Sequence, residues 1–217
     1  MVVAIAGAHG KIAVRLTRLL AGDGDDVLGL IRNPNHAADV TANGASPVVC
    51  DLEQASVEEI AQAIAGAGAA VFAAGAGPGS GTERKLTMDR DGAVKFLHAA
   101  AAADAQRFVI ISSTGAEAPP PGDDVFGVYL RAKAHADQAV QDSDRHWTIV
   151  RPGPLTEDPG TRRVRIESAP FRGRVPRDDV AAVLARLVHD DRFSRRVFYI
   201  NSGEDPLEQA LERFLAL

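Results

Sequence analysis

The N-terminal stretch MVVAIAGAHGKIAVRLTRLLAG, residues 1–22, decides the fold. Residues 2–6 are continuously apolar, as in a strand that is buried on both faces. A turn with two glycines follows, and residues 11–21 then place apolar side chains at helical spacing. A strand, a tight turn and a helix in this order form the first unit of an α/β fold with a parallel sheet.

The same alternation of short apolar runs and helical segments continues along most of the chain. Most runs are too continuously apolar for a sheet with one face in water, so helices should cover both faces. The pattern predicts a Rossmann-type, doubly wound and mainly parallel sheet of about seven strands. The predicted strands are Val2–Ala6, Val27–Ile31, Ser46–Cys50, Ala69–Ala73, Arg107–Ile111, Trp147–Val150 and Val197–Ile200, and the predicted crossover helices are Lys11–Ala21, Val57–Ala65, Glu83–Ala103 and Phe126–Gln141.

The alternation breaks after the sixth predicted strand. A stretch rich in Pro, Gly and Arg follows, then a predicted helix from about Asp178 to Val188, a strand, and a final helix from Leu207. The length of 217 residues fits one domain that spans the whole chain. We therefore assign residues 152–176 and 201–217 to a small peripheral elaboration on the substrate side of that domain.

Composition and charge restrict the class of partner. Hydrophobic residues make up 46% of the chain and charged residues 24%, which is ordinary for a globular protein. The net charge is -5 and the sequence has no Lys- or Arg-rich run, which argues against nucleic acid and membrane surfaces as partners. We expect a small-molecule substrate and a monomer or small homo-oligomer.

The cysteine and histidine residues give no sign of a disulfide or a metal site. Cys50 is the only cysteine, and at the end of a predicted buried strand it fits a small hydrophobe better than a nucleophile. The six histidines lack the paired spacing of zinc ligands, so we predict no metal. The sequence shows no signal peptide or membrane span, which predicts a cytoplasmic location.

The turn after the first strand has the chemistry of a phosphate-binding loop. In GAHGKIA, residues 7–13, the glycines follow a GxxGxxA pattern. Glycine lets the backbone approach a diphosphate closely, and the N-terminus of the next helix offers unpaired N–H groups and a positive dipole. We predict a dinucleotide whose pyrophosphate contacts Gly7, Ala8, His9, Gly10, Lys11 and Ile12.

The end of the second predicted strand indicates which dinucleotide binds. A carboxylate there would bind the ribose hydroxyls of NAD(H), but this chain has Arg32, whose guanidinium matches a 2′-phosphate in charge and geometry. Lys11 or His9 could assist it. We expect NADP(H) as the cofactor, and NAD(H) is the alternative. If Arg32 does not bind a phosphate, it is an ordinary solvated side chain. Asp51, after the third strand, is expected to accept from the adenine amino group or to cap the next helix.

Six segments in order resemble the atypical branch of the short-chain dehydrogenase/reductase superfamily, which includes NmrA-like and sugar-epimerase-like proteins. They are GAHGKIA (7–13), Asp51-Leu52, Ala73-Ala74-Gly75, Ile111-Ser112-Ser113-Thr114, Tyr129-Leu130-Arg131-Ala132-Lys133 and Val150-Arg151-Pro152-Gly153-Pro154-Leu155. The resemblance covers nearly the whole chain. It implies that the cofactor site includes Leu52, Ala74, Gly75, Ser112 and Lys133, with Pro152 and Gly153 closing over the nicotinamide.

The same resemblance implies that Tyr129 and Lys133 form a catalytic YxxxK pair and that Thr114 or Ser113 holds the substrate oxygen. Residues four apart share a helix face, and a nearby ammonium stabilises a phenolate, so the pair can exchange a proton with a carbonyl or alcohol oxygen. The alternative is a tyrosine that only packs. The chain departs from many relatives at Asp89, which stands where they have an asparagine.

These features predict an NADP(H)-dependent oxidoreductase that reduces a carbonyl or oxidises an alcohol of a small molecule. One alternative is an NmrA-like regulatory protein that binds NADP(H) as a redox sensor without turnover. Another is an epimerase or dehydratase that retains its nucleotide. The loops 75–82, 115–125 and 153–176 should frame the substrate pocket, but their composition does not identify the substrate.

Overall fold

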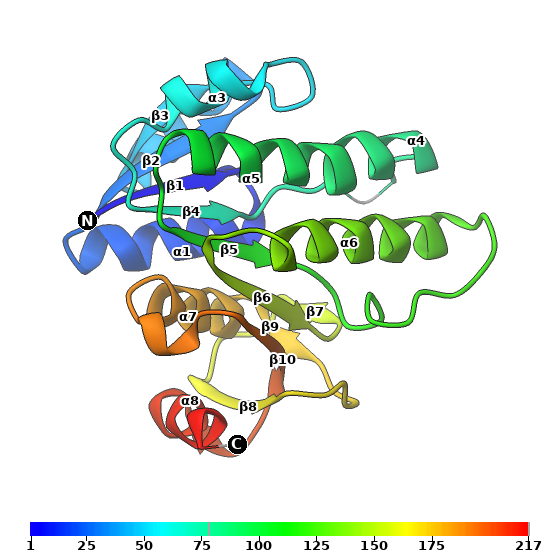
Figure 1. Ribbon diagram of the computed structural model, residues 1–217. Helices are drawn as coiled ribbons and strands as arrows, with labels where there is room; N and C mark the ends of the chain where they lie inside the picture. Colours follow the sequence, from blue (N-terminus) through cyan, green and yellow to red (C-terminus); the bar gives the residue numbers. More distant parts are fainter. Residues whose placement is uncertain (78, 217) are drawn as a thin grey trace.

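The computed structural model describes residues 1–77 and 79–216, and within them a nine-stranded sheet carries helices on both faces (Figure 1). The strands are β1 (Val2–Ala6), β2 (Asp26–Ile31), β3 (Ala45–Val49), β4 (Ala69–Phe72), β5 (Arg107–Ile111), β6 (His146–Pro152), β8 (Arg163–Glu167), β10 (Arg196–Ser202) and β11 (Asp205–Pro206). Their order in the sheet is β11-β8-β10-β6-β5-β4-β1-β2-β3. Strands β1 to β6 and β10 run parallel, which confirms the predicted doubly wound α/β fold.

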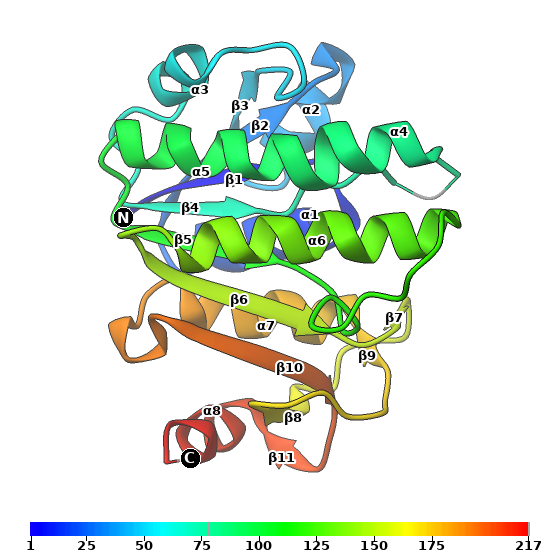
Figure 2. The same cartoon turned by 45° about the vertical axis from the view of Figure 1, so that its right-hand side comes forward.

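Two helical layers bury the two faces of the sheet. Helices α1 (Lys11–Gly22) and α7 (Arg177–Leu187) cover one face, and α3 (Val57–Ala63), α5 (Ala93–Ala102) and α6 (Val125–Gln141) cover the other (Figures 1 and 2). The core between the sheet and helices α3, α5 and α6 contains a row of aromatic rings. The ring centroids are 6.1 Å apart between Phe72 and Phe96 and 6.0 Å apart between Phe96 and Phe108. The central strands β1, β4 and β5 are apolar on both faces, as strands of a parallel sheet between two helical layers are.

Residues 153–176 contribute a strand that the sequence analysis did not predict. β8 pairs antiparallel with β10, and β11 pairs antiparallel with β8, so the sheet gains two strands beyond the seven predicted. Along β8, Val164 and Ile166 are buried while Arg163 and Arg165 face solvent. This alternation is typical of a strand with one face in water, but the surrounding prolines and glycines hid it.

The predicted helix Glu83–Ala103 is present but is not uniformly α-helical. It begins as α4 (Thr82–Arg84), continues as the π-helix η2 (Lys85–Gly92) and ends as α5. A π-helical segment changes which side chains face inward and is frequent at functional sites. Here Asp89, within η2, is only 1% exposed.

The smaller elements lie around the edges of the sheet. They are η1 (Pro34–His36), α2 (Ala37–Ala42), the paired strands β7 (Leu155–Thr156) and β9 (Val175–Pro176), η3 (Asp191–Phe193) and α8 (Leu207–Leu215). Helix α8 packs against the sheet through Phe214, whose ring stacks on Phe198 at a centroid distance of 4.2 Å. None of the described helices combines the length and apolarity needed to cross a membrane.

Candidate dinucleotide and catalytic site

The loops at the carboxyl edge of the parallel strands enclose two adjoining hollows. The adenine-side hollow, of about 350 Å³, lies at the ends of β2 and β3. The substrate-side hollow, of about 750 Å³, extends past β4 and β5 to α6. Both are lined by His9, Gly10 and the segment 73–75, so they form one groove. Doubly wound sheets bind ligands at this edge, where the strand order reverses between β1 and β4.

The glycine turn brings the backbone of β1 against the loop after β4. Gly7 has a φ of +77°, and a Cβ atom there would lie 2.7 Å from the Cα of Ala74. The N–H groups of Gly7 and Ala8 donate to the carbonyl of Leu30, at 3.2 and 3.0 Å, and are therefore not available to a ligand. Gly10 caps α1 without a side-chain acceptor, so the first-turn N–H groups of residues 11–13 are the donors that a diphosphate would meet.

Arg32 lies at the mouth of the adenine-side hollow with a side chain that is 54% exposed. Its Nη1 is 3.4 Å from Oε2 of Glu53, a weak contact. Glu53 has firmer partners, because the Thr87 hydroxyl donates to it at 2.6 Å and Arg84 at 3.3 Å. Although partial burial works against the charge, these partners and the charge of Arg32 hold the pKa of Glu53 below its usual value. Arg32 is therefore held only by this long contact with Glu53.

Two histidine rings stack beside this arginine in the lining of the adenine-side hollow. The centroids of His9 and His36 are 3.7 Å apart, and Nε2 of His9 lies 3.0 Å from a carboxylate oxygen of Asp39. His9 was predicted and His36 was not, because nothing in sequence places η1 over the glycine turn. Within residues 1–77 and 79–216, no group of three or more His, Cys, Asp or Glu side chains is arranged to hold a metal ion.

Asp51 and Leu52 line the same hollow. Oδ1 of Asp51 accepts the N–H of Glu53 at 3.0 Å. Asp51 does not cap α3, which begins with a capping box formed by Ser56 and Glu59. Cys50 also lines the hollow, and burial raises the pKa of its thiol, so it stays protonated.

Tyr129 and Lys133 lie one turn apart on α6 and both line the substrate-side hollow. The ammonium of Lys133 is 5.8 Å from the centroid of the tyrosine ring, and that of Lys85 is 5.4 Å from it. Two cationic groups therefore lie near one phenol ring. They attract the negative charge that develops on the phenol oxygen when it gives up a proton.

The buried carboxylate of Asp89 holds the ammonium of Lys133 in place. Its Nζ donates to the carbonyl of Ile111 at 3.0 Å and lies 3.4 Å from Oδ1 of Asp89, whose Oδ2 accepts the N–H of Ala76 at 3.1 Å. Burial alone would lower the pKa of Lys133, but its electrostatic interactions with Tyr129, Asp89 and Asp137 and its hydrogen bond to Asp89 outweigh burial and raise that pKa. The lysine is thus held as a cation at neutral pH.

A second buried ion pair lies behind the site. The Ser112 hydroxyl donates to Oδ2 of Asp137 at 2.7 Å, and Nε of Arg151 donates to the same oxygen at 3.0 Å. Arg151 also donates to the hydroxyl of Tyr199. Burial raises the pKa of Asp137, against the opposing effect of Arg151 and Ser112. Ser112 lines the substrate-side hollow, but its proton is committed to Asp137.

Neither Ser113 nor Thr114 is part of the groove lining. The Thr114 hydroxyl donates to the carbonyl of Arg151 at 3.2 Å, and the Ser113 hydroxyl points to the carbonyl of Thr114 at 3.1 Å. Thr114 and Gly153 instead line a separate hollow of about 430 Å³. Pro152, at the end of β6, is buried.

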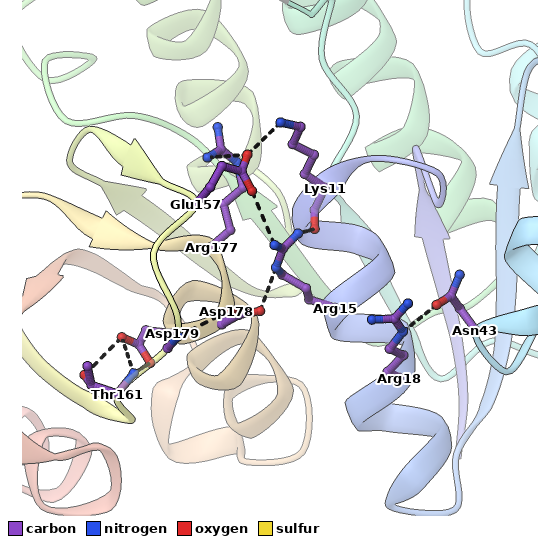
Figure 3. Close-up of polar contacts among 10 residues, drawn as sticks. Lys11, Arg15, Arg18, Asn43, Glu157, Thr161, Arg177, Asp178 and Asp179 are labelled. Atoms are coloured by element: carbon purple, nitrogen blue, oxygen red, sulfur yellow. Dashed lines mark hydrogen bonds and ion pairs between the residues drawn. The ribbon is translucent and has the colours of Figure 1, made fainter.

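A salt-bridge cluster joins the glycine turn to the segment after β7 (Figure 3). Glu157 accepts from Lys11 at 2.6 Å and lies 3.1 Å from Arg177 and 3.3 Å from Arg15. Lys11 and Arg177 both line the substrate-side hollow. Ion pairs therefore hold the segment that carries Glu157 against the cations beside the glycine turn.

Comparison with known proteins identifies the family. A family model described as NAD(P)H-binding matches residues 7–191, which include the glycine turn and strands β2 to β6. The chain belongs to this NAD(P)H-binding family. Its members and structural relatives include oxidoreductase-like and epimerase-like proteins, which confirms the resemblance to atypical short-chain dehydrogenases/reductases.

Similar proteins cover this NAD(P)H-binding chain almost completely. An uncharacterized sugar epimerase, YhfK, from Bacillus subtilis is 35% identical over 98% of this chain and 100% of its own length. The structure of a putative NAD-dependent epimerase/dehydratase from Bacillus halodurans superposes with a TM-score of 0.91, at 33% identity, over 98% of this chain and 99% of that one. The oxidoreductase YlbE from Lactococcus lactis gives a TM-score of 0.88 at 27% identity, over 100% and 98% of the two chains.

Proposed function

We propose that this protein is an NADP(H)-dependent oxidoreductase that reduces a carbonyl, or oxidises an alcohol, of a small molecule. The arrangement of Tyr129 supports this proposal most directly, because its side chain lines the same groove as the glycine turn and two ammonium groups lie within 6 Å of its ring centroid, at 5.4 and 5.8 Å. A proton donor beside a dinucleotide site is the constellation that carbonyl reduction needs.

The groove fits an extended dinucleotide phosphate. The glycine at position 7 leaves no room for a side chain, the first turn of α1 presents backbone donors, and Arg32 lies at the ribose end with only a weak carboxylate contact. We infer that the pyrophosphate lies over the start of α1 and that Arg32, assisted by His9, binds a 2′-phosphate. This favours NADP(H) over NAD(H).

When bound, the nicotinamide donates or accepts the hydride. During reduction Tyr129 gives its phenolic proton to the substrate oxygen as the carbonyl carbon gains the hydride, so a carbonyl becomes an alcohol. Lys133 stabilises the resulting phenolate, and Asp89 keeps Lys133 charged and in place. We assign the acid/base role to Tyr129 and the positioning role to Asp89.

The proposal is tested by NADPH oxidation with a panel of small aldehydes and ketones. Wild type is expected to oxidise NADPH only when a carbonyl is present, and Tyr129→Phe should lower kcat by about 100-fold or more, since general acid catalysis contributes about 10²–10⁴. Tyr199→Phe removes the same hydroxyl from a tyrosine that lines neither hollow, and it serves as the matched control. An absence of turnover across the panel, or a Tyr129→Phe variant as active as wild type, would refute the proposal.

A second candidate is an epimerase or dehydratase, which the names of two similar proteins favour. Such an enzyme would copurify with nucleotide and convert substrate without net cofactor consumption. An NADP(H) sensor without turnover would instead bind nucleotide and show no reaction in either assay. We further propose that the protein acts in the cytoplasm on a small molecule, as a monomer or small homo-oligomer.

A further inference from the structure

Lys85 differs from the other cations that line the substrate-side hollow. Lys11 and Arg177 share Glu157, and Lys133 is paired with Asp89. In the part of the chain that the structure describes, residues 1–77 and 79–216, no carboxylate lies within 4.0 Å of the Lys85 ammonium, which donates to the carbonyl of Gly77 at 3.0 Å. Its charge is therefore available to a ligand.

An exposed apolar wall faces this cation across the same hollow. Val125 and Phe126, in the first turn of α6, are 46% and 61% exposed, although most large apolar side chains of the chain are buried. The ring centroid of Phe126 lies 6.0 Å from that of Tyr129, and all three side chains line the hollow. Exposed apolar side chains that are grouped at a hollow indicate a binding surface, whereas a single exposed apolar side chain is normal.

Lys85 is placed for the substrate and not for the nucleotide. It lines the hollow that contains Tyr129 and does not line the hollow that contains Arg32. Its ammonium is within 5.4 Å of the Tyr129 ring centroid, so a group bound to Lys85 lies next to the proton donor. A substrate must then offer an anion at this point and an apolar body toward α6.

We infer that the substrate is a flat apolar or aromatic carbonyl compound that carries an anionic group, with the anion on Lys85 and the apolar body against Phe126 and Val125. This rests on the proposed function and specifies the class of molecule that the same site takes. The charge complementarity with Lys85 selects the anion, and the exposed wall selects a flat apolar body over a sugar.

The test compares binding of 2-naphthoate with binding of its neutral methyl ester, measured by calorimetry on the NADPH-saturated protein and on the nucleotide-free protein. Wild type should bind the acid about tenfold more tightly than the ester, as a charge-assisted hydrogen bond predicts. Lys85→Met should reduce that ratio to within about twofold, and Lys85→Glu should reverse it. Arg177→Met, which removes a cation that already has a carboxylate partner, is the matched control and should keep the ratio. Phe126→Ser should weaken both ligands.

The inference is wrong if wild type binds neither ligand, binds both equally, or keeps its preference in Lys85→Met. If Lys85 acted only through Tyr129, its loss would lower turnover of charged and neutral carbonyls alike and leave the binding ratio unchanged. Binding needs no reaction, so the two proposals fail separately. A protein that reduces carbonyls without preferring the acid refutes only the inference, and one that prefers the acid without consuming NADPH refutes only the proposed reaction.

Discussion

The Nζ of Lys133 lies 3.4 Å from Oδ1 of Asp89, and the two side chains are only 4% and 2% exposed. An ion pair this deep is costly to break, because the partner left behind is a buried charge without compensation. Asp89 also accepts the N–H of Ala76, so one carboxylate fixes both Lys133 and the loop after β4. The pair therefore joins η2 and this loop to α6.

Replacing Asp89 by asparagine should destabilise the protein. The amide keeps the size of the side chain and an acceptor for Ala76, but the negative charge beside Lys133 is lost. We expect a loss of about 3 kcal/mol in the free energy of unfolding at pH 7, as for other buried pairs that lose one partner. Urea denaturation of wild type and Asp89→Asn measures it, and equal stability would contradict the account.

The same pair predicts how stability depends on alkaline pH. The pKa of Lys133 is raised in the folded protein, so the stabilisation it provides is fully present below the lysine pKa of the unfolded chain, about 10.4. It is lost as pH rises from that value through the folded pKa. The difference in unfolding free energy between wild type and Asp89→Asn should therefore be constant from pH 7 to 9 and shrink above about pH 10.4. A difference that grows with pH would contradict the assignment.

The close approach of the glycine turn to the loop after β4 predicts a large effect of a single methyl group. Gly7→Ala places a Cβ atom 2.7 Å from the Cα of Ala74 on a backbone with a φ of +77°. Gly24→Ala is the matched control, since Gly24 has a φ of +89° but nothing within 4 Å. The control should lose about 1–2 kcal/mol of stability from the left-handed backbone alone, and Gly7→Ala about 1–3 kcal/mol more, from overpacking. Thermal denaturation compares the two variants. Equal losses of stability would contradict a steric clash between the new Cβ atom and Ala74.

Local sequence predicted the elements that position the groove. The continuous apolar runs, the glycine turn and the helical segments each carry a local signal, and the seven parallel strands appear where these signals placed them within a few residues. β8 was missed because only five residues alternate, between segments rich in proline and glycine. Its place in the sheet depends on pairing with β10, which is about 30 residues farther along the chain.

The contacts between distant side chains could not be predicted in the same way. The sequence pattern predicted that Tyr129 and Lys133 form a pair, because they are four residues apart on one helix. The Asp137–Arg151 pair and the approach of Lys85 to Tyr129 join elements that only the tertiary fold brings together. The π-helical segment that buries Asp89 also has no local signature in sequence.

Thr114 provides a test that separates the sequence resemblance from the observed geometry. The resemblance assigns Thr114 or Ser113 to the substrate oxygen, yet the Thr114 hydroxyl donates to the carbonyl of Arg151 and lines a separate hollow. If that arrangement persists during turnover, Thr114→Val should change kcat by less than about threefold, compared with the 10²–10⁴-fold range of a true acid/base group. A loss of about 100-fold, with thermal stability unchanged, would place Thr114 at the substrate after all.

The central claim, that the groove binds NADP(H) through Arg32, is tested most directly by calorimetric titration of NADPH and NADH into wild type, Arg32→Ala and the control Arg18→Ala. Arg18 lies on α1, where it contacts Asn43 and lines neither hollow (Figure 3). The account predicts that Arg32→Ala weakens NADPH about tenfold or more, as loss of a charge-assisted contact does, while NADH binding and the control variant change by less than about twofold. Equal affinity of wild type and Arg32→Ala for NADPH, or no binding of either nucleotide, would contradict it.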